Sequence, residues 1–302
     1  MFELPPSDDL LARALAEDLG AEPGCFLGQC PVDEALLETD ATSAGTVPAD
    51  AVFRGEIVAR EAGVVCGLPL VERTYQLLAA ASGTEPVSCF PLVAEGADIS
   101  PGVAVLEVEG PVRAVLAGER TGLNVLMLLS GIASEARRWQ RAAGNSLTVV
   151  DTRKTLPGLR ALSKYAVRVG GASNHRAGLW DMVLIKDNHL AYAGSVTTAV
   201  EAVRRARPEL LVECEADTID QAVEAARAGA DYVLLDNMSD EVLTEAVRAV
   251  REAADGRTVL TEASGRITFE RLTTLAATGV DRVSASALTM AGPLDFGLDT
   301  VG

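Results

Sequence analysis

Residues 210–236, LLVECEADTIDQAVEAARAGADYVLLD, carry the clearest architectural signal in the chain. Two apolar runs, LLVECE (210–215) and YVLLD (232–236), flank a segment with helical spacing of its apolar residues. Thr218 and Gln221 match a capping box, which predicts a helix over 218–228. An apolar strand, a helix and a second apolar strand indicate a parallel βαβ unit whose strands are buried on both faces.

The same alternation extends on both sides of this unit. A second helix is expected over 240–254, and four further strands are expected at LTVVD (147–151), MVLIK (182–186), VLTEAS (259–264) and RVSAS (282–286). Six parallel strands with helices between them predict an α/β barrel or a nearly closed one, because a short dinucleotide-binding unit has fewer strands.

The first 117 residues show a different pattern of predicted helices and strands. A helix is expected over 8–19 with Ser7 as its cap, followed by an acidic, irregular segment over 20–40. Short β-like runs such as 52–59 and 103–108 then indicate a small α+β domain. A long helical pattern begins at Glu119 and ends near Gly144, between this domain and the βαβ region.

Composition limits the classes of partner. The chain has 302 residues with 26 Lys and Arg against 43 Asp and Glu, so its formal charge of −17 argues against nucleic acid and membrane surfaces as partners. The start, MFELPPSDDL, lacks the order of a signal peptide, and no apolar run approaches the ~20 residues of a membrane helix. We therefore expect a cytoplasmic protein. Five cysteines without a C-x-x-C pair favour reduced, structural thiols.

Polar residues follow five of the predicted strands where each one ends. Carboxyl ends of parallel strands gather at one edge of a sheet, where α/β proteins place their chemistry. Any one of these residues alone would be expected to be a solvated loop residue. Five consecutive strand ends predict a shared site that includes Arg153, Lys154, Lys186, Glu213, Glu215, Asp236, Ser264 and Gly265.

Residues 151–189 form a basic segment in an acidic chain. They hold seven Lys or Arg against three Asp, which predicts a site for a small polyanion. Arg160, Lys164 and Arg168 are more simply explained as the wet face of a helix. Both histidines lie in this segment; His175, between Gly170-Gly171 and Arg176, is the better candidate for a substrate contact than His189. Scattered thiols and two histidines do not favour zinc.

Two further groups complete the predicted site. Glu215 and Asp236 end neighbouring strands, where they can share Mg²⁺ with substrate oxygens or simply cap the following helices. Ser264-Gly265 precedes a helix expected to start near Thr268, an arrangement that suits a phosphate. Together these groups predict a phosphorylated, Mg-bound substrate and a second anionic substrate.

The longest motifs resemble one family. They are GERTGLNVLMLLSGIAS (118–134), DTRKTLPGLRALSKYAVRVGGASNHRAGLWDMVLIKDNH (151–189), VECEAD (212–217), VLLDNMS (233–239) and EASG (262–265). These stretches closely resemble quinolinate phosphoribosyltransferases, and the resemblance extends over essentially the whole chain. It implies a pentosyltransferase of NAD biosynthesis, the carboxylating nicotinate-nucleotide diphosphorylase activity. That enzyme converts quinolinate and phosphoribosyl pyrophosphate into nicotinate mononucleotide, CO₂ and pyrophosphate.

The resemblance also implies an architecture and an assembly. An N-terminal α/β sandwich domain would occupy 1–117, an incomplete α/β barrel 118–288, and a C-terminal tail over 289–302 would return to the first domain. The protein would be a homodimer or a larger homo-oligomer with active sites shared between subunits.

Site residues carry over by motif. Arg153, Lys154, His175, Arg176 and Lys186 would hold the quinolinate carboxylates, with Arg120 reaching in from the partner subunit. Glu215 and Asp236 would contact the ribose and Mg²⁺, and Ser264, Gly265 and Ser286 the phosphate. Lys154, Glu215 and Asp236 would be the catalytic groups.

Three positions depart from the family pattern. Ser286 stands where a glycine is usual, Met290 where a histidine is usual, and Arg266 where a second glycine often follows Ser264-Gly265. These departures affect the phosphate side of the predicted site. They leave two alternatives open: a paralogue that uses another heteroaromatic acid or phosphosugar, and a catalytically silent homologue that keeps the anion pocket.

Overall fold

The computed structural model describes residues 3–301, which form two compact units. One unit takes the residues up to Glu135, Ala161–Gly170 and the residues from Ala291 onward. The other takes Ala136–Arg160 and Gly171–Met290. No helix within residues 3–301 is long and apolar enough to cross a membrane.

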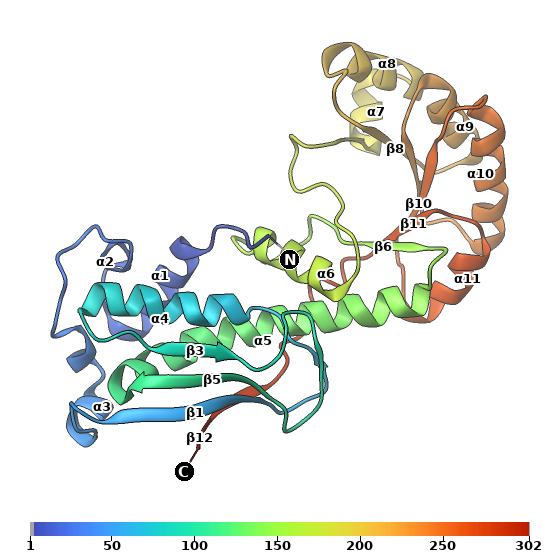
Figure 1. Cartoon of the computed structure of the whole chain (residues 1–302). Coiled ribbons are helices and arrows are strands. Elements are labelled where there is room, and N and C mark those ends of the chain that lie inside the picture. Colours follow the sequence, from blue (N-terminus) through green and yellow to red (C-terminus); the bar gives the residue numbers. More distant parts are fainter. Residues whose placement is uncertain (1–2, 302) are drawn as a thin grey trace. The chain divides into compact units, whose positions relative to one another are not determined.

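The first unit is built on an antiparallel sheet of order β12-β1-β5-β3 (Figure 1). Its strands are β1 (Val52–Ala59), β3 (Ser88–Pro91), β5 (Ala104–Pro111) and β12 (Phe296–Thr300). A separate pair joins β2 (Gly63–Val64) to β4 (Asp98–Ile99). The tail therefore returns to this unit as an edge strand, with Gly55 opposite Thr300 and Ala59 opposite Phe296.

In Figure 1 the two longest helices of this unit, α4 (Leu68–Ser82) and α5 (Val112–Ala143), run along the sheet, and α5 contributes residues to both units. The other helical segments of this unit are α1 (Asp8–Leu19), α2 (Pro23–Phe26), η1 (Leu36–Thr39), α3 (Ala41–Thr46) and α6 (Arg160–Gly170). Glycines allow α5 to pack closely: a Cβ at Gly118 would lie 2.7 Å from the Tyr75 ring. A Cβ at Gly131 would collide with the backbone of Gly292 in the tail.

Four predictions for this part of the chain can be compared with the structure. Helix α1 has the predicted bounds, but the Ser7 side chain makes no capping bond. Helix α5 begins at Val112, seven residues before the prediction, because it follows directly on β5. The expectation that all thiols are reduced is wrong, since Cys25 and Cys30 are disulfide-bonded on either side of a short turn. Lys164 is buried, 4% exposed, and does not belong to a wet face.

The second unit contains a six-stranded parallel sheet of order β6-β11-β10-β9-β8-β7. Strands β6 and β7 form its two edges, so the predicted barrel is open. The strands are β6 (Thr148–Val150), β7 (Val183–Ile185), β8 (Val212–Ala216), β9 (Tyr232–Asp236), β10 (Leu260–Ser264) and β11 (Arg282–Ser284). All six lie where the sequence predicts them.

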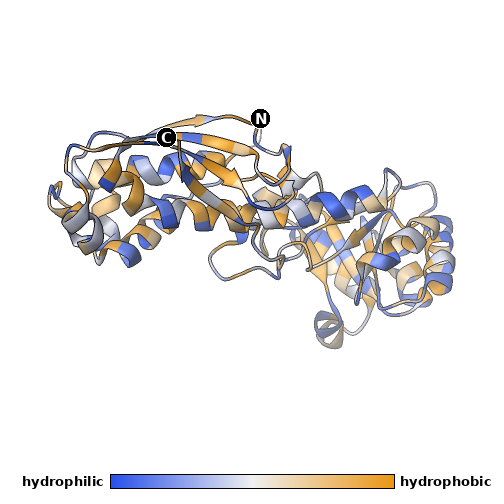
Figure 2. Cartoon of the chain, turned by 90° about the horizontal axis from the view of Figure 1, so that it is seen from below, coloured by the Kyte–Doolittle hydropathy of each residue, from blue (hydrophilic) through white to orange (hydrophobic). Residues whose placement is uncertain are grey.

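Helices separate these strands along the chain, as expected for βαβ units. They are α7 (Asp187–Ala193), α8 (Val196–Ala206), α9 (Ile219–Ala228), α10 (Asp240–Ala253), η2 (Phe269–Arg271) and α11 (Leu272–Ala277). The predicted capping box at the start of α9 is present, with Thr218 and Gln221 bonding reciprocally. Figure 2 shows hydrophobic residues concentrated on the strands, which agrees with strands that are buried on both faces.

Candidate active site

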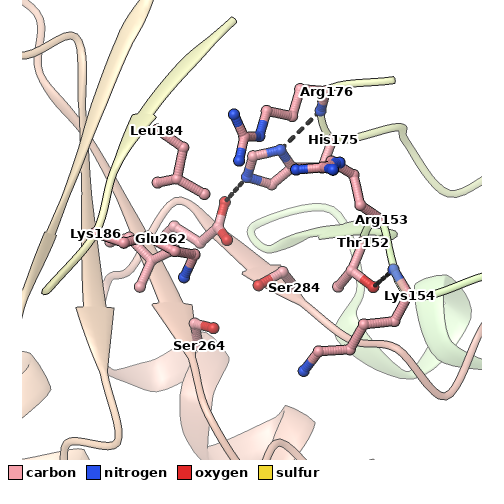
Figure 3. Close-up of a pocket in the computed structure, with 11 residues that line it drawn as sticks. Thr152, Arg153, Lys154, His175, Arg176, Leu184, Lys186, Glu262, Ser264 and Ser284 are labelled. Atoms are coloured by element: carbon pink, nitrogen blue, oxygen red, sulfur yellow. Dashed lines mark hydrogen bonds and ion pairs between the residues drawn. The ribbon is translucent and has the colours of Figure 1, made fainter. Parts of the chain in front are cut away.

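A cavity of about 170 Å³ opens where the strands of the second unit end (Figure 3). Its walls come from the loop after β6, the segment between α6 and β7, the ends of β7, β10 and β11, and the middle of β9. The lining residues are Thr152, Arg153, Lys154, His175, Arg176, Leu184, Lys186, Leu234, Glu262, Ser264 and Ser284. Six predicted site residues are among them, so the structure brings together most of what the motifs singled out.

Strand periodicity explains which side chains face the cavity. Residues two apart on a strand point to the same face. Leu184 and Lys186 therefore share a face, as do Glu262 and Ser264 on β10. The sheet register places Ser264 opposite Asp236 at the end of the neighbouring strand.

The cationic wall of the cavity is formed by Arg153 and Arg176. Burial and the neighbouring charge of Arg153 lower the pKa of Arg176, while Glu213 and Asp181 act in the opposite direction. The following turn is fixed by the Asp181 carboxylate, which accepts the N–H groups of Ala177 and Gly178 at 2.6 and 2.9 Å. Two guanidinium groups held close together favour a ligand with two negative charges.

His175 is held at three points. Its backbone N–H donates to the buried Asp151 carboxylate at 2.9 Å, and Nδ1 accepts the backbone N–H of Arg176 at 2.7 Å. Nε2 lies 2.9 Å from Glu213 Oε2. Both ring nitrogens therefore have partners inside the protein, and the predicted contact of His175 with a substrate carboxylate stays a prediction.

Three residues at the base of the cavity form a buried group: the sequence placed Glu213 in the predicted shared site but gave Glu262 and Arg282 no role. Glu213 and Glu262 are 0% exposed, and Arg282 on β11, which adjoins β10 but not β8, contacts both of them. Their position could have been found in the sequence from a spacing of two residues on each strand: Glu213 with Glu215, Glu262 with Ser264, and Arg282 with Ser284. That spacing places each residue one layer below a residue at the strand end, facing the same way.

The two buried carboxyls differ in pKa. Burial favours the protonated form of Glu213, but hydrogen bonding from His175 and the charge of Arg282 outweigh it and lower the pKa. Burial and the charge of Glu213 raise the pKa of Glu262 to about 7. Glu213 is thus the carboxylate that stays ionised beside Arg282.

The predicted carboxylate pair lies on adjacent strands. Glu215 on β8 forms an ion pair with Lys186, and Asp236 at the end of β9 accepts a bond from the Asn237 amide. Glu215 is 9% exposed, and neither carboxylate is among the residues lining the cavity. Each retains a second oxygen, and hard carboxylate oxygens suit Mg²⁺ together with substrate phosphates.

The predicted phosphate loop is only partly as expected. Gly265 has φ +83°, and a Cβ there would lie 2.4 Å from the Asn237 side chain, so the turn requires glycine. Arg266 is also left-handed at φ +50°, a conformation that favours the glycine usual in the family. The following helical segments η2 and α11 have three and six residues, so they add less dipole than a long helix would.

Three other predicted positions have a clear place. Lys154 is positioned through its backbone: its N–H donates to Thr152 Oγ1 at 3.0 Å, and its carbonyl accepts the Thr289 hydroxyl at 2.6 Å. Ser286 is half-buried outside the cavity lining, and Met290 is 54% exposed. Both departures from the family pattern therefore avoid the cationic wall.

Two candidates lie away from the cavity lining. Arg120 belongs to the first unit, where it is 60% exposed and lies 3.9 Å from Glu119. Its predicted role in a partner subunit's site stays a prediction. His189 accepts the N–H of Lys186 through Nδ1 at 2.8 Å, so it caps the start of α7 and needs no substrate to explain it.

The described part of the chain holds two sets of carboxylates that bear on metal binding. Within residues 3–301, one group of three metal-type side chains lies close together: His175, Glu213 and Glu262. The Arg282 guanidinium contacts both carboxyl groups, with Nε 2.5 Å from Glu262 Oε2, and its positive charge would repel a metal ion. Glu215 and Asp236, which the sequence predicts as Mg²⁺ ligands, are a separate pair of hard oxygen donors on neighbouring strands, and Glu215 is paired with Lys186.

The fold and the cavity define a class of protein: an α/β protein with an open, six-stranded parallel sheet and a cavity lined by cationic side chains at its strand ends. The chain matches the family described as quinolinate phosphoribosyl transferase, with the N-terminal domain over residues 40–130 and the C-terminal domain over residues 132–299. The chain belongs to this family.

Individual relatives agree with this assignment. The chain is 40% identical over 299 residues to the nicotinate-nucleotide pyrophosphorylase [carboxylating] of Mycobacterium leprae, with 98% of each chain covered. It is 41% identical over 245 residues to the protein of that name from Homo sapiens, with 80% of each covered. The crystal structure of NadC from Streptococcus pyogenes is similar at a TM-score of 0.86 and 36% identity, with 100% of both chains covered.

Proposed function

We propose that the chain transfers the phosphoribosyl group of phosphoribosyl pyrophosphate to quinolinate and removes one carboxylate, making nicotinate mononucleotide, CO₂ and pyrophosphate for NAD biosynthesis. The observation that carries this proposal is the pair Arg153 and Arg176, held side by side at the strand ends of a chain that is 40% identical to a carboxylating pyrophosphorylase over 98% of its length. A pyridine dicarboxylate supplies the two negative charges that this pair favours.

Electrostatics and positioning account for the first step. The pyridine nitrogen donates its lone pair to the anomeric carbon as the bond to pyrophosphate breaks, and pyrophosphate leaves with that electron pair. Glu215 and Asp236 would stabilise the positive charge that develops on the sugar, and Lys154 would offset the negative charge of the leaving group. No protein atom forms a covalent bond to either substrate.

The second step follows from the charge of the new pyridinium ring. The carbon–carbon bond to the adjacent carboxylate breaks, CO₂ leaves, and the electron pair stays on the ring carbon, which then takes up a proton. Arg153 and Arg176 would orient the ring by holding the remaining carboxylate.

Mg²⁺ is the proposed cofactor, with Glu215 and Asp236 as its protein ligands. It would neutralise charge on the leaving pyrophosphate when bound. In the structure Glu215 is paired with Lys186, so binding of the metal would require Lys186 to turn away from that carboxylate. Lys186 would then be available to a substrate carboxylate.

The assembly and location belong to the same proposal. A homodimer or larger homo-oligomer would allow Arg120 of one subunit to complete the site of another, which its 60% exposure permits. We propose a cytoplasmic enzyme whose partners are two small anionic substrates. The net charge of −17 is consistent with this, because it disfavours nucleic acid and anionic membranes.

The proposed function is tested by measuring the ratio of the two released products. Purified protein supplied with quinolinate, phosphoribosyl pyrophosphate and Mg²⁺ is expected to release CO₂ and pyrophosphate in equal amounts. Protein that releases neither product would contradict the proposal. A panel of pyridine mono- and dicarboxylates, run with the parent, Ser286→Gly and Met290→His proteins, would detect the paralogue alternative. Tight quinolinate binding without turnover would identify the silent homologue.

A further inference from the structure

A buried polar layer lies at the base of the cavity in the second unit, and its member Glu262 is one of the lining residues. It consists of Glu213 on β8, Glu262 on β10 and Arg282 on β11. Strands β10 and β11 are adjacent in the sheet, and β9 lies between β8 and β10. Both carboxyl residues are 0% exposed, and the Arg282 side chain is 12% exposed. Burying charged groups in this way is expensive unless their partners are well placed, so the layer needs an explanation beyond packing.

Each carboxylate oxygen of Glu213 faces a donor. Oε1 lies 2.9 Å from Arg282 Nη2, and Oε2 lies 2.9 Å from His175 Nε2. Arg282 also contacts Glu262 Oε2 through Nε at 2.5 Å and stacks on the Tyr232 ring, with its central carbon 3.8 Å from the ring centroid. The guanidinium is therefore fixed from three sides, and it fixes Glu213 in turn.

The hydrogen-bond pattern assigns the proton on His175. Because Nδ1 accepts the N–H of Arg176, that nitrogen carries no proton, so the neutral ring carries its proton on Nε2. The same nitrogen lies 2.9 Å from Glu213 Oε2 and 3.5 Å from Glu262 Oε2, so Glu213 is its nearest acidic partner. Neither ring nitrogen remains for a substrate oxygen.

The chain of contacts ends at the cationic wall. Arg282 holds Glu213, Glu213 holds the imidazole, and the imidazole holds the backbone N–H of Arg176. The Arg176 side chain lines the cavity beside that of Arg153. A displaced ring would therefore shift the start of the Arg176 side chain relative to Arg153.

We propose that Glu213, Glu262 and Arg282 form a positioning layer, which fixes the Nε2–H form of His175 and through it sets Arg176 to grip the dicarboxylate substrate. Glu213 is the central positioning residue, since it alone contacts both His175 and Arg282 with separate oxygens. The substrate identity in this inference rests on the proposed function, but the fixed imidazole does not. In this inference His175 serves the site through the position it gives Arg176.

The kinetic test replaces Glu213 with Gln. One acceptor oxygen becomes an amide donor that faces either His175 or Arg282, so one contact is lost. We expect KM for quinolinate to rise about tenfold, as for loss of one hydrogen bond to a charged group, while KM for phosphoribosyl pyrophosphate stays within about twofold. Equal effects on both substrates, or no effect on either, would overturn the proposal.

Asp281→Asn is the matched control. Asp281 also accepts bonds in the same unit, from the Thr261 N–H and hydroxyl at 2.7 Å, but it lies before β11 at the opposite ends of the strands. The control is expected to lower stability without a selective rise in the quinolinate KM. Should Glu213→Gln fail to fold, Glu213→Asp keeps the charge beside Arg282 and shortens the reach to His175, with the same expected split.

A double-mutant cycle tests whether Glu213 acts through His175. His175→Asn removes the ring, so adding Glu213→Gln to that variant is expected to change the quinolinate KM less than twofold. Additive effects of the two substitutions would show that Glu213 acts by another route.

A spectroscopic readout separates this inference from the proposed function. The chain has two histidines, so ¹⁵N-histidine labelling of the parent and a His189→Asn variant assigns the His175 resonances. We expect an unprotonated Nδ1 and a protonated Nε2 in the parent, and a loss of this fixed pattern in Glu213→Gln. A protonated Nδ1 in the parent would overturn the inference even in an active enzyme, whereas the expected pattern in an inactive protein would overturn only the function.

Discussion

The two sides of the cavity are constructed differently. On the side of Arg153 and Arg176, buried Asp151 and Glu213 hold His175, and Asp181 holds the turn that follows. On the side of β8 to β10, Glu215 pairs with Lys186 and Asp236 with Asn237, in contacts between neighbouring strand-end residues.

This difference indicates two ways of binding. The first side is braced by groups that no ligand needs to displace, so its cations are set before the dicarboxylate arrives. The second side neutralises its carboxylates with local partners, which a phosphosugar and Mg²⁺ would exchange for their own contacts. Each prediction below breaks one side and asks whether the other is affected.

Asp236→Ala is expected to have the largest effect. It removes one of two carboxylates proposed to stabilise the developing charge and hold Mg²⁺, so kcat/KM for phosphoribosyl pyrophosphate should fall by about 10²–10³. Steady-state kinetics with each substrate varied in turn would measure this. An equal loss of quinolinate affinity would contradict the division into two sides.

Arg153→Ala is the converse change. It removes one charged partner of the dicarboxylate while the Arg176 side chain keeps its contact with the Met182 carbonyl at 3.4 Å. We expect the quinolinate KM to rise about thirtyfold to a hundredfold, the effect of losing a charge-assisted pair of hydrogen bonds. A change in KM for phosphoribosyl pyrophosphate of similar size would show that Arg153 belongs to both sides.

Asp151→Asn tests the hydrogen bonds that hold His175 in place and leaves Arg153 and Arg176 unchanged. Asp151 accepts bonds from the Asn174 amide at 2.7 Å and the His175 N–H at 2.9 Å, so an amide group there places donor against donor. A rise of about tenfold in the quinolinate KM and a loss of about 1–3 kcal/mol of stability are expected. Thermal unfolding beside the kinetics measures both; a stability loss without the KM change would make Asp151 purely structural.

Glu262→Gln tests the pH dependence of the buried layer. Burial and the charge of Glu213 raise the pKa of Glu262, while Arg282, His175 and Ser284 lower it. The resulting pKa is about 7, above the usual 4.5. The folded state therefore holds this proton more tightly than the unfolded chain, and the stability it contributes is present below pH 4.5 and lost as the pH rises through 7.

The comparison of parent and variant isolates this effect. Relative to Glu262→Gln, the parent should lose roughly 2 kcal/mol of stability between about pH 5 and pH 8. Urea unfolding of both proteins at the two pH values measures the difference. Parallel curves would mean that Glu262 is ionised throughout and that the layer carries an uncompensated charge.

Arg266→Gly should have the smallest effect. Arg266 is left-handed at φ +50°, so glycine relieves about 1 kcal/mol of backbone strain and raises the unfolding midpoint slightly. If the Arg266 side chain contacts the phosphate, KM for phosphoribosyl pyrophosphate will rise in the same variant. An unchanged KM would assign the residue no part in the phosphate grip.

Sequence periodicity predicted the strands of the second unit well, because each is a short apolar run between turn residues. It also placed Arg153, Lys186 and Ser264 together, since carboxyl ends of parallel strands converge. The predicted start of α5 was wrong because residues 112–118, VRAVLAG, hold a single polar residue and therefore show no helical or strand period; the structure places the boundary at Pro111, where β5 ends.

The disulfide and the buried polar layer were not predicted, because both depend on contacts between residues that the sequence does not reveal one position at a time. The Cys25–Cys30 bond joins residues whose spacing fits no common metal or redox motif. The layer of Glu213, Glu262 and Arg282 required three strands to be in register, and a buried acid in a strand looks the same in sequence as a solvated one.

Titration of quinolinate into the protein without phosphosugar or Mg²⁺ tests the central claim most directly, since the first side should bind alone. Calorimetry is expected to show saturable binding in the parent, the same affinity within about twofold in Asp236→Ala, and a loss of about tenfold or more in Arg153→Ala. Binding that appears only after the phosphosugar is added, or that Asp236→Ala weakens as much as Arg153→Ala, would contradict a preformed dicarboxylate side.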